Sequence, residues 1–289
     1  MSAGFAFIDE ALDRADELRS DAAALNARRR DAHCLWLDAR GEARMDGEGG
    51  LLLEDGAPAD AVFLGRRGDA CFFAAQRDAP WGDDIVRLDL RGAAAQWSAF
   101  ESTLFAQARA VLHWRGSHRW CPACGGALTY SRGGWQGDCA TCGRVEYPRS
   151  DPAVIVAVSD GERLLLGRQA SWPARRYSTL AGFVEPGESL EQAIAREVWE
   201  ESRVRVTAAR YLASQPWPFP GSLMLGFIAH AEPDAPQTAQ DELEDARWFG
   251  RAEIIEALRV DHPDAPLRLS PRLSISRWLI ERWAGGERA

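Results

Sequence analysis

A dense group of glutamates lies in one stretch of the chain, at a spacing that suits a loop and the helix after it. Glu188 belongs to a glycine-rich loop, and Glu197, Glu200 and Glu201 follow with Arg196 beside them. These three later glutamates have the i, i+3, i+4 relation, so they share one face of a helix. Hard oxygen ligands at this density suit Mg²⁺ or Mn²⁺. The stretch therefore indicates a site that holds divalent cations against a phosphate chain, as a pyrophosphate hydrolase would.

The helix that carries these glutamates is predicted to begin at about Ser189. Ser189 and Gln192, three residues later, form a capping box. Leu190, Ile194 and Val198 recur at four-residue intervals and mark the buried face. The mean direction of the glutamates falls roughly 70° from the centre of that face. They therefore lie at the border of the core, where like charges repel one another unless a cation lies between them.

The alternative is an ordinary solvated acidic face that pairs with Arg196 and Arg203. The spacing of the whole set favours the metal site instead. Gly182, five residues, Glu188, seven residues and then Arg-Glu-Val-Trp-Glu-Glu resembles the Nudix box. Arg203 departs from it, because the family usually has Gly there, a residue suited to a left-handed helix C-cap.

Length and composition narrow the possible classes of protein. The 289 residues are 46% hydrophobic and include 12 Trp, enough for two domains or for a small module between two larger ones. The net charge of −9 argues against a general nucleic-acid-binding surface. All 34 basic residues are arginine, so cationic phosphate contacts must come from Arg, a metal or backbone N–H groups. We find no signal-peptide pattern and no long apolar run, which predicts a soluble cytoplasmic protein without membrane contact.

Residues 1–115 are predicted to form an N-terminal mixed α/β domain. A charged helical stretch at 8–30 precedes several short strands, and a helical apolar stripe runs from 97 to 112. The strands are expected at 34–37, 51–53, 62–64, 71–74 and 85–90, with a turn at 68–69. His33, Cys34 and Cys71 are interpreted as packed structural residues, and no catalytic constellation is found in this region.

Two C-x-x-C knuckles follow, separated by residues 125–138 within an expected ribbon at 116–148. Their spacing is one residue short of the usual spacing of a four-cysteine zinc site, a difference that a loop accommodates. Four thiolates leave no open coordination position, so one structural zinc per chain is predicted. A disulfide framework does not suit a reducing compartment, and four cysteines do not suit a redox pair. The expected zinc ligands are Cys121, Cys124, Cys139 and Cys142.

Residues 149–289 are predicted to form the second large unit. Strands at 153–158 and 163–166 flank Asp160-Gly161, a hairpin signal. Further strands are expected near 204–213, 222–230 and 245–249. Ser270-Pro271 would start the last helix, and Gly285 would end it. The mixture predicts an α/β unit with a mixed sheet covered by helices.

A run of alternating prolines, from Ser214 to Ser222, provides a second signature. Proline fixes φ, so this backbone is pre-ordered. A surface polyproline segment that recruits a partner domain is the alternative. The run lies between predicted strands of one unit, which favours a rigid rim whose aromatics, amide and hydroxyls recognise a nucleotide ring.

Joined to the glutamate stretch, this run resembles the NADH pyrophosphatase branch of the Nudix hydrolases, whose mark is Ser-Gln-Pro-Trp-Pro-Phe-Pro-x-Ser. The cysteine ribbon, Tyr147-Pro148, Asp151–Ile155 and Glu242–Phe249 are similar to that family too, so the resemblance covers about 116–283. It implies a Nudix-type mixed sheet covered by helices, preceded by a four-cysteine zinc ribbon and the N-terminal α/β domain. A homodimer is also implied.

The resemblance also implies a set of site residues. Glu188 would pair with Arg196 to hold the helix in place, and Glu201 would be the general base or the ligand of the attacking water. The metal ligands for Mg²⁺ or Mn²⁺ would be Glu197, Glu200, Glu201, Glu242 and the carbonyl of Ala181. The substrate contacts would be Tyr147, Phe183, Gln215, Pro216, Trp217, Pro218, Phe219, Pro220, Gly221, Ser222 and Ser276.

The activity implied by the resemblance is hydrolysis of the pyrophosphate of NADH or NAD⁺ to nicotinamide mononucleotide and AMP. Metals would neutralise the diphosphate and lower the pKa of the attacking water. Removal of an NAD cap from RNA breaks the same bond, while the acidic net charge favours the free dinucleotide. Two other classes stay open. A catalytically weak nucleotide sensor should have lost a carboxylate of the box, and a zinc-ribbon nucleic-acid-binding protein needs basic surface near 121–142.

Overall fold

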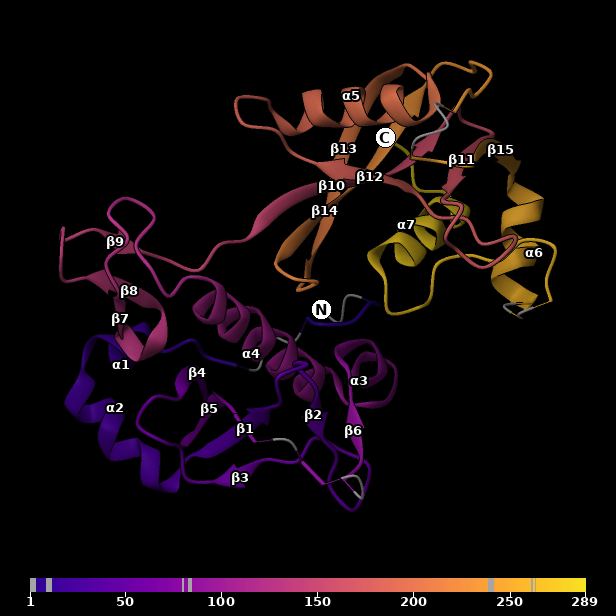
Figure 1. The fold of residues 1–289 in the computed structure, drawn as a ribbon. Coiled ribbons are helices and arrows are strands. Elements are labelled where there is room, and N and C mark those ends of the chain that lie inside the picture. Colours follow the sequence, from indigo (N-terminus) through magenta and orange to yellow (C-terminus); the bar gives the residue numbers. More distant parts are fainter. Residues whose placement is uncertain are drawn as a thin grey trace.

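The computed structural model describes residues 4–8, 12–79, 81–82, 85–238, 242–260, 262 and 264–289. Three sheets follow one another along the chain, and each is built from consecutive strands (Figure 1). Within the described residues, no helix is both long enough and apolar enough to cross a membrane.

The N-terminal unit is a mixed sheet with helices. Its strand order is β4-β5-β1-β2-β6, with β3 paired to β1, and β1 runs parallel to β5. The strands are β1 (His33–Leu37), β2 (Ala43–Arg44), β3 (Glu54–Asp55), β4 (Val62–Arg67), β5 (Ala70–Gln76) and β6 (Arg87–Leu88). The helices are α1 (Asp16–Ser20), α2 (Ala22–Arg28), the 3₁₀ turn η1 (Arg29–Asp31), α3 (Leu90–Gln96) and α4 (Ala99–Ser117). Leu104 and Phe105 of α4 pack with Leu35 and Leu64 of the sheet in one core.

Three expectations for this unit need correction. Residues 9–11 of the helix expected at 8–30 lie outside the described part of the chain, and the rest of that range contains two short helices, because the side chain of Asp21 accepts hydrogen bonds from the first turn of α2 and separates it from α1. The strand expected at 51–53 is reduced to an isolated bridge at Leu51. The strand expected at 85–90 stops at Leu88, because Asp89 caps α3 by accepting from the Gly92 amide.

The ribbon is a small antiparallel sheet in the order β7-β8-β9. Its elements are β7 (Leu128–Ser131), the 3₁₀ turn η2 (Arg132–Gly134), β8 (Gln136–Cys139) and β9 (Val145–Glu146). It lies between the two larger units along the chain, and β10 leads from it into the third sheet (Figure 1).

The third sheet has the order β13-β14-β10-β11-β15, with β12 paired to β10. Strands β10 and β14 are parallel and the other pairs are antiparallel, so the predicted mixed sheet is confirmed. Its strands are β10 (Asp151–Ser159), β11 (Arg163–Arg168), β12 (Leu180–Phe183), β13 (Val206–Trp217), β14 (Ser222–Ala231) and β15 (Asp245–Gly250). Its helices are α5 (Leu190–Ser202), α6 (Arg251–Val260) and α7 (Ile275–Ala284).

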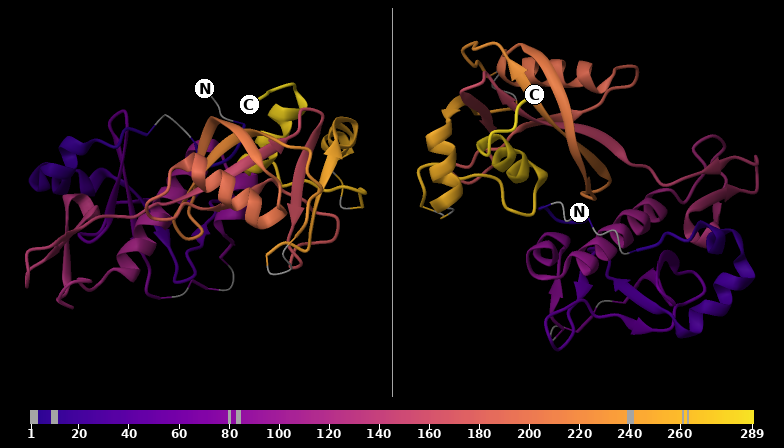
Figure 2. Two further views of the ribbon diagram at one scale, coloured as in Figure 1. Left: turned by 90° about the horizontal axis from the view of Figure 1, so that it is seen from above. Right: turned by 180° about the vertical axis from the view of Figure 1, so that it is seen from behind.

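Helices cover both faces of this sheet, α5 on one side and α6 with α7 on the other (Figure 2). Successive side chains of a strand point to opposite faces. Val154 and Val156 of β10 therefore join the core under α5, while Ile155 and Ala157 join the core under α7. The two cores lie back to back across one sheet.

The start of the last helix was predicted incorrectly. Helix α7 begins after Ser274, whose side chain accepts a hydrogen bond from the Ser276 amide, and not at Ser270-Pro271. The hydroxyl of Ser270 is used elsewhere, in a buried contact with Ser276 at 3.1 Å. The helix ends at Gly285 as expected.

The β13–β14 hairpin joins the third unit to the N-terminal unit. Strand β13 continues to Trp217, and its position at the sheet edge tolerates Pro216. The tip of the hairpin lies beside the N-terminal segment and α4 (Figures 1 and 2). There Trp217 and Phe219 pack against the N-terminal core and meet the ring of Phe7 at 6.1 and 6.4 Å between centroids.

Candidate active site

The glutamate-bearing helix begins where the sequence predicts. Ser189 and Gln192 make both halves of the capping box, since the Ser189 hydroxyl accepts from the Gln192 amide and the Gln192 side chain accepts from the Ser189 amide. Ile194 and Val198 are fully buried against the sheet. At the C-terminus, Arg203 adopts the left-handed conformation with φ 58°, so an arginine occupies the backbone geometry that usually calls for glycine.

Arg196 joins the glycine-rich loop to the helix. Its guanidinium makes an ion pair with Glu188 at 2.6 Å and another with Glu197 at 2.8 Å. It also donates to the carbonyl oxygen of Phe183 at 2.9 Å and lies 3.4 Å from Glu200. The hydrogen bonds from Arg196 hold the pKa of Glu188 below its usual value. The predicted pairing of Glu188 with Arg196 is therefore present.

Glu201 is a buried carboxyl group, with 9% of the residue exposed. Its Oε2 atom has no hydrogen-bond partner among the described residues. Burial raises its pKa to about 8, and repulsion from Glu197 and Glu242 adds to the rise, while a backbone hydrogen bond from Ala181 lowers it. The protein thus keeps a carboxyl group where its charge is unfavourable unless a cation compensates it.

Glu197 lies directly over Gly182 of β12. A Cβ atom at that glycine would lie 1.8 Å from the Glu197 Cδ, so no other residue fits there without displacing the carboxylate. Burial raises the pKa of Glu197, the ion pair with Arg196 opposes this, and Glu200 and Glu242 raise it further. Glu242 is distant in the sequence and exposed, and its negative charge therefore influences the same site.

The structure thus gathers the predicted carboxylates at the edge where β12 meets α5. Several negative charges converge there, two of them on half-buried or buried groups whose pKa values are raised. Oxygen ligands in this arrangement fit a hard divalent cation, which would relieve their repulsion. The residues involved are Ala181, Glu188, Arg196, Glu197, Glu200, Glu201 and Glu242.

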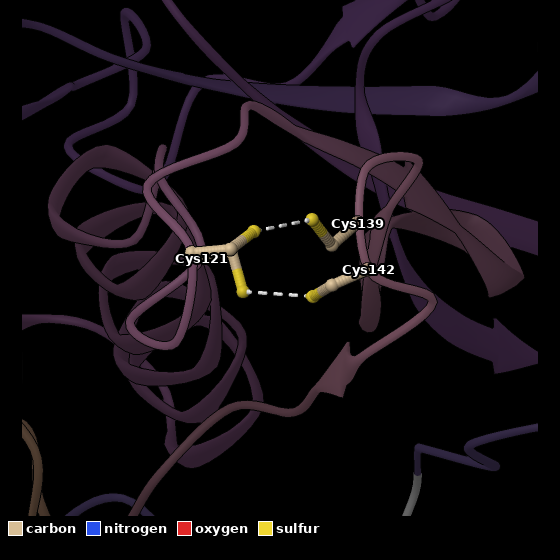
Figure 3. Close-up of side chains that lie close together, drawn as sticks. Cys121, Cys139 and Cys142 are labelled. Atoms are coloured by element: carbon tan, nitrogen blue, oxygen red, sulfur yellow. Dashed lines mark hydrogen bonds between the residues drawn. The ribbon is translucent and has the colours of Figure 1, made fainter.

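The four ribbon cysteines form a second, separate cluster (Figure 3). All four Sγ atoms lie within 4.8 Å of one another, and the Cys121–Cys142 and Cys124–Cys139 pairs are 3.7 and 3.5 Å apart. A tetrahedral zinc with Zn–S bonds of about 2.3 Å places sulfurs about 3.8 Å apart, so the geometry fits. All four are free cysteines.

The backbone of the knuckles is turned toward these thiols. Gly125 and Gly143, each directly after a knuckle, have φ values of 72° and 73°, a conformation that favours glycine. Hydrogen bonds from the Cys142 and Thr141 amides lower the pKa of Cys139 to about 6. A lowered pKa favours the thiolate form that metals bind.

A cavity of about 480 Å³, here called the Ser276 cavity, lies on the α7 side of the third sheet. Gln215, Trp217 and Ser276, three of the predicted substrate contacts, line it together although they come from distant parts of the chain. The other lining residues include Arg91, Ile155, Trp172, Arg176, Ser178 and Met224.

The wall at Ser276 is a cluster of hydroxyl groups. The Ser276 Oγ lies 2.9 Å from both the Ser178 Oγ and the Thr179 Oγ1, and 3.1 Å from the Ser270 Oγ. Ser276 itself is 1% exposed. This network holds the N-terminus of α7 against the loop before β12.

The Ser276 cavity and the carboxylates are adjacent across one strand pair. Ile155 lines the cavity, and its partner in the neighbouring strand β12 is Ala181. The Ala181 backbone in turn makes the hydrogen bond to Glu201. A ligand in the cavity therefore lies against the strand pair whose other side carries the carboxylates.

The side chains of the run from Ser214 to Ser222 do not all line one cavity. Gln215 is fully buried, its amide donates to the carbonyls of Ala6 and Leu273, and its Oε1 accepts from the Ile275 amide. These hydrogen bonds connect β13 to the N-terminal segment and to the start of α7. Successive side chains of β13 point to opposite faces of the sheet, and the chain turns after Trp217. The remaining side chains of the run therefore lie in different surroundings. Phe219 packs on the N-terminal core and Pro220 lines a further cavity beside α4, whereas Pro216, Pro218, Gly221 and Ser222 line a cavity described below.

Tyr147 and Phe183 do not line the Ser276 cavity. They are 59% and 58% exposed, which is unusual for aromatic side chains of this size. Tyr147 follows β9 of the ribbon, and Phe183 ends β12 beside Arg196.

Two arginines that line the cavity were not predicted as site residues from the sequence. Arg91 belongs to α3 of the N-terminal unit and stacks over Phe219 at 4.3 Å, and no local pattern connects it with the third sheet. Arg176 belongs to the pair Arg175-Arg176, whose placement depends on the fold. Burial lowers the pKa of Arg176, and repulsion from Arg268 and Arg91 lowers it further.

Known proteins resemble this chain over most of its length. A NUDIX domain model matches residues 149–270. The NAD-capped RNA hydrolase NudC of Mycobacterium bovis is 40% identical over 291 residues, which cover 95% of this chain and 93% of the relative, and NudC of Mycobacterium tuberculosis shows the same values. The human NAD-capped RNA hydrolase NUDT12 is 42% identical over 193 residues, or 63% of this chain and 42% of the relative. The chain therefore belongs to the NADH pyrophosphatase branch of the Nudix hydrolases, the family of NudC.

Proposed function

We propose that this protein hydrolyses the pyrophosphate bond of NADH and NAD⁺ to nicotinamide mononucleotide and AMP, and removes the NAD cap from RNA. The observation that carries the proposal is the position of the Ser276 cavity against the β10–β12 pair, opposite the buried Glu201. The cavity and the carboxylates lie on opposite faces of this strand pair, so a dinucleotide in the cavity would extend around the free edge of β12 to bring its diphosphate to the carboxylates. The names of the NudC and NUDT12 relatives support the same activity.

In this proposal the carboxylates hold the divalent cations. Glu197, Glu200, Glu201, Glu242 and the Ala181 carbonyl are the proposed ligands, with Glu201 as the general base or the ligand of the attacking water. Bound Mg²⁺ or Mn²⁺ would neutralise the diphosphate and lower the pKa of that water. The ion pair between Arg196 and Glu188 holds the loop against the helix, so that the carboxylates face the substrate.

The Ser276 cavity offers groups that suit a dinucleotide. Arg91 and Arg176 carry positive charge that phosphate would neutralise, and their mutual repulsion favours an anion between them. Trp172 and Trp217 supply ring surfaces for a base or a nicotinamide ring. Tyr147 and Phe183, which are exposed, are proposed to complete the site when the substrate or a second copy of the chain is present.

We also propose one structural zinc in the ribbon, a homodimer in solution and a cytoplasmic location. The sulfur geometry supports the zinc, and the exposure of the aromatic side chains of Tyr147 and Phe183 supports the homodimer, in which a second copy would cover them. Metal analysis and light scattering of the purified protein test the first two.

The activity is tested with the full chain, NADH and either Mg²⁺ or Mn²⁺, followed by chromatography of the products. We expect AMP and the reduced nicotinamide mononucleotide in equal amounts, with no release after chelation. Binding of NADH without release of AMP would make the protein a sensor and overturn the proposal. Parallel rates on NADH and NAD-capped RNA determine which substrate is preferred.

A further inference from the structure

A second cavity, here called the Gln107 cavity, shares a wall with the Ser276 cavity. Its volume is about 210 Å³, and it lies between α4 of the N-terminal unit, residues 148–150 and the end of the β13–β14 hairpin. Trp217 lines both cavities. Both spaces therefore border the Trp217 side chain.

The wall formed by α4 carries polar atoms that the protein leaves unused. Gln107 is 8% exposed, and its Nε2 donates to the Leu64 carbonyl at 2.6 Å. Its Oε1 and the Thr103 Oγ1 are buried and have no hydrogen-bond partner in the described part of the chain. The two residues are four apart on one helix face and both line the cavity. Buried unpartnered oxygens are costly, so they favour a ligand that donates hydrogen bonds.

Positive charge surrounds the same cavity, although the chain as a whole is acidic. Arg14 and Arg149 line it. Arg14 makes no ion pair with any described residue, and Arg149 has one long pair to Asp151 at 3.8 Å. The acids near Arg14 are engaged elsewhere, since Asp13 pairs with Arg66 at 2.9 Å and Asp16 with Arg132 at 2.7 Å. These arginines are therefore available to an anion.

A second aromatic ring lines the Gln107 cavity in addition to Trp217. Trp135 lines it and is held in place by donating its Nε1 hydrogen to the Phe63 carbonyl at 2.6 Å. The guanidinium of Arg19 stacks over this ring at 4.1 Å, which adds to the local positive charge. Aromatic rings, arginines and hydrogen-bonding groups in one groove are the features that bind single-stranded nucleic acid.

We propose that the Gln107 cavity binds the first nucleotide on the 3′ side of the NAD moiety in capped RNA. Its phosphate lies at Arg14 and Arg149, its base against Trp217 or Trp135, and a ribose hydroxyl or base amino group donates to Gln107. This inference rests on the proposed function, which places the dinucleotide in the Ser276 cavity, and Trp217 borders both cavities. Free NADH has no such nucleotide, so the cavity distinguishes the two substrates.

The test compares NADH with NAD-capped oligoribonucleotides on the full chain carrying Arg14→Ala, Arg149→Ala or both. We expect kcat/KM for the capped RNA to fall about ten-fold for the double variant, and NADH hydrolysis to stay unchanged. The slope of log KM against log salt for the RNA should flatten by about 0.7 for each arginine removed. Arg14→Lys keeps the charge and should keep the slope. Arg259→Ala, on the exposed face of α6 and paired with Glu256, is the control that should change neither substrate.

The outcomes separate this inference from the proposed function. Wild-type protein that does not hydrolyse NADH contradicts the proposed function itself. Wild-type activity on both substrates, with equal losses or no loss in the variants, overturns the Gln107 cavity as an RNA site. A second experiment measures NADH turnover in the presence of a free mononucleotide such as CMP. If it changes NADH turnover in an Arg14-dependent way, the cavity serves a free nucleotide and not the RNA chain.

Discussion

The two candidate metal centres of this chain are assembled in opposite ways. In the ribbon, all ligands come from residues 121–142, and the four sulfurs already lie within 4.8 Å of one another. The carboxylate centre draws on β12, α5 and the distant Glu242. Its carboxylates repel one another, which contributes to the raised pKa values of Glu197 and Glu201.

The contrast between the two centres indicates different roles for their metals. A closed set of four thiolates has no free coordination position, so its metal contributes to folding. Carboxylates held in partly buried, mutually repelling positions bind a cation that keeps room for water and phosphate. We therefore expect damage to the ribbon to lower stability, and damage to the carboxylate centre to lower turnover.

The largest effect is expected for Glu201→Gln. Glutamine keeps the shape but cannot carry the charge, so turnover of NADH should fall about a thousand-fold, equivalent to about 4 kcal/mol. Steady-state hydrolysis at saturating Mg²⁺, with circular dichroism for the fold, provides the measurement. Glu191→Gln, on the exposed first turn of the same helix, is the matched control. Unchanged turnover of the Glu201 variant would remove this residue from the mechanism.

Cys139→Ser should act on stability instead. Loss of one buried thiolate prevents closure of the zinc site, and we expect the free energy of unfolding to fall by roughly 3 kcal/mol, with zinc lost from the protein. Thermal unfolding and metal analysis measure both. Cys71→Ala, which removes a buried cysteine outside the ribbon, should keep the zinc. Full stability combined with a loss of turnover as large as that of Glu201→Gln would reverse the comparison.

The metal-free protein should lose stability as pH rises. The folded pKa of Glu201 is about 8, above the unfolded value of 4.5, so the folded state binds a proton more tightly between these values. The stability that this proton contributes is present at low pH and is lost as pH rises toward 8, with a slope of up to about 1.4 kcal/mol per pH unit.

Denaturant unfolding in chelator at several pH values measures this slope. Glu201→Gln should flatten it. Glu191→Gln should leave the slope unchanged. The pKa of Glu191 is lowered in the folded state, so this group affects stability only at more acidic pH. An equal slope in wild type and Glu201→Gln would show that this carboxyl group is not the source.

The smallest effect is expected where α5 ends. A left-handed backbone is unfavourable in free energy for arginine. The stacking of the Arg203 guanidinium over the Trp199 ring at 5.6 Å offsets part of this cost. Arg203→Gly should therefore raise the free energy of unfolding by about 0.5 kcal/mol, measured by denaturant titration without change in turnover. Arg203→Ala keeps the unfavourable backbone and loses the stacking, so it should lower stability. A stabilised alanine variant would contradict this account of the helix end.

Sequence patterns predicted the elements whose causes are local. The capping box at Ser189 and the hairpin at Asp160-Gly161 depend on residues a few positions apart. Patterns were less reliable where two local signals competed. Ser270-Pro271 is as good a helix start as Ser274, and the buried hydroxyl cluster around Ser276 decides between them.

The sequence by itself determined which ligands this protein has and how they are spaced, namely four thiols in two knuckles and three glutamates on one helix face. The tertiary structure alone decided which of these groups are buried and what surrounds them. It buried Glu201, brought Glu242 to act on it, and moved Arg91 of the N-terminal unit to the Ser276 cavity. The physical reason is that spacing is a property of the local backbone, whereas burial, repulsion and cavities arise from packing between distant segments.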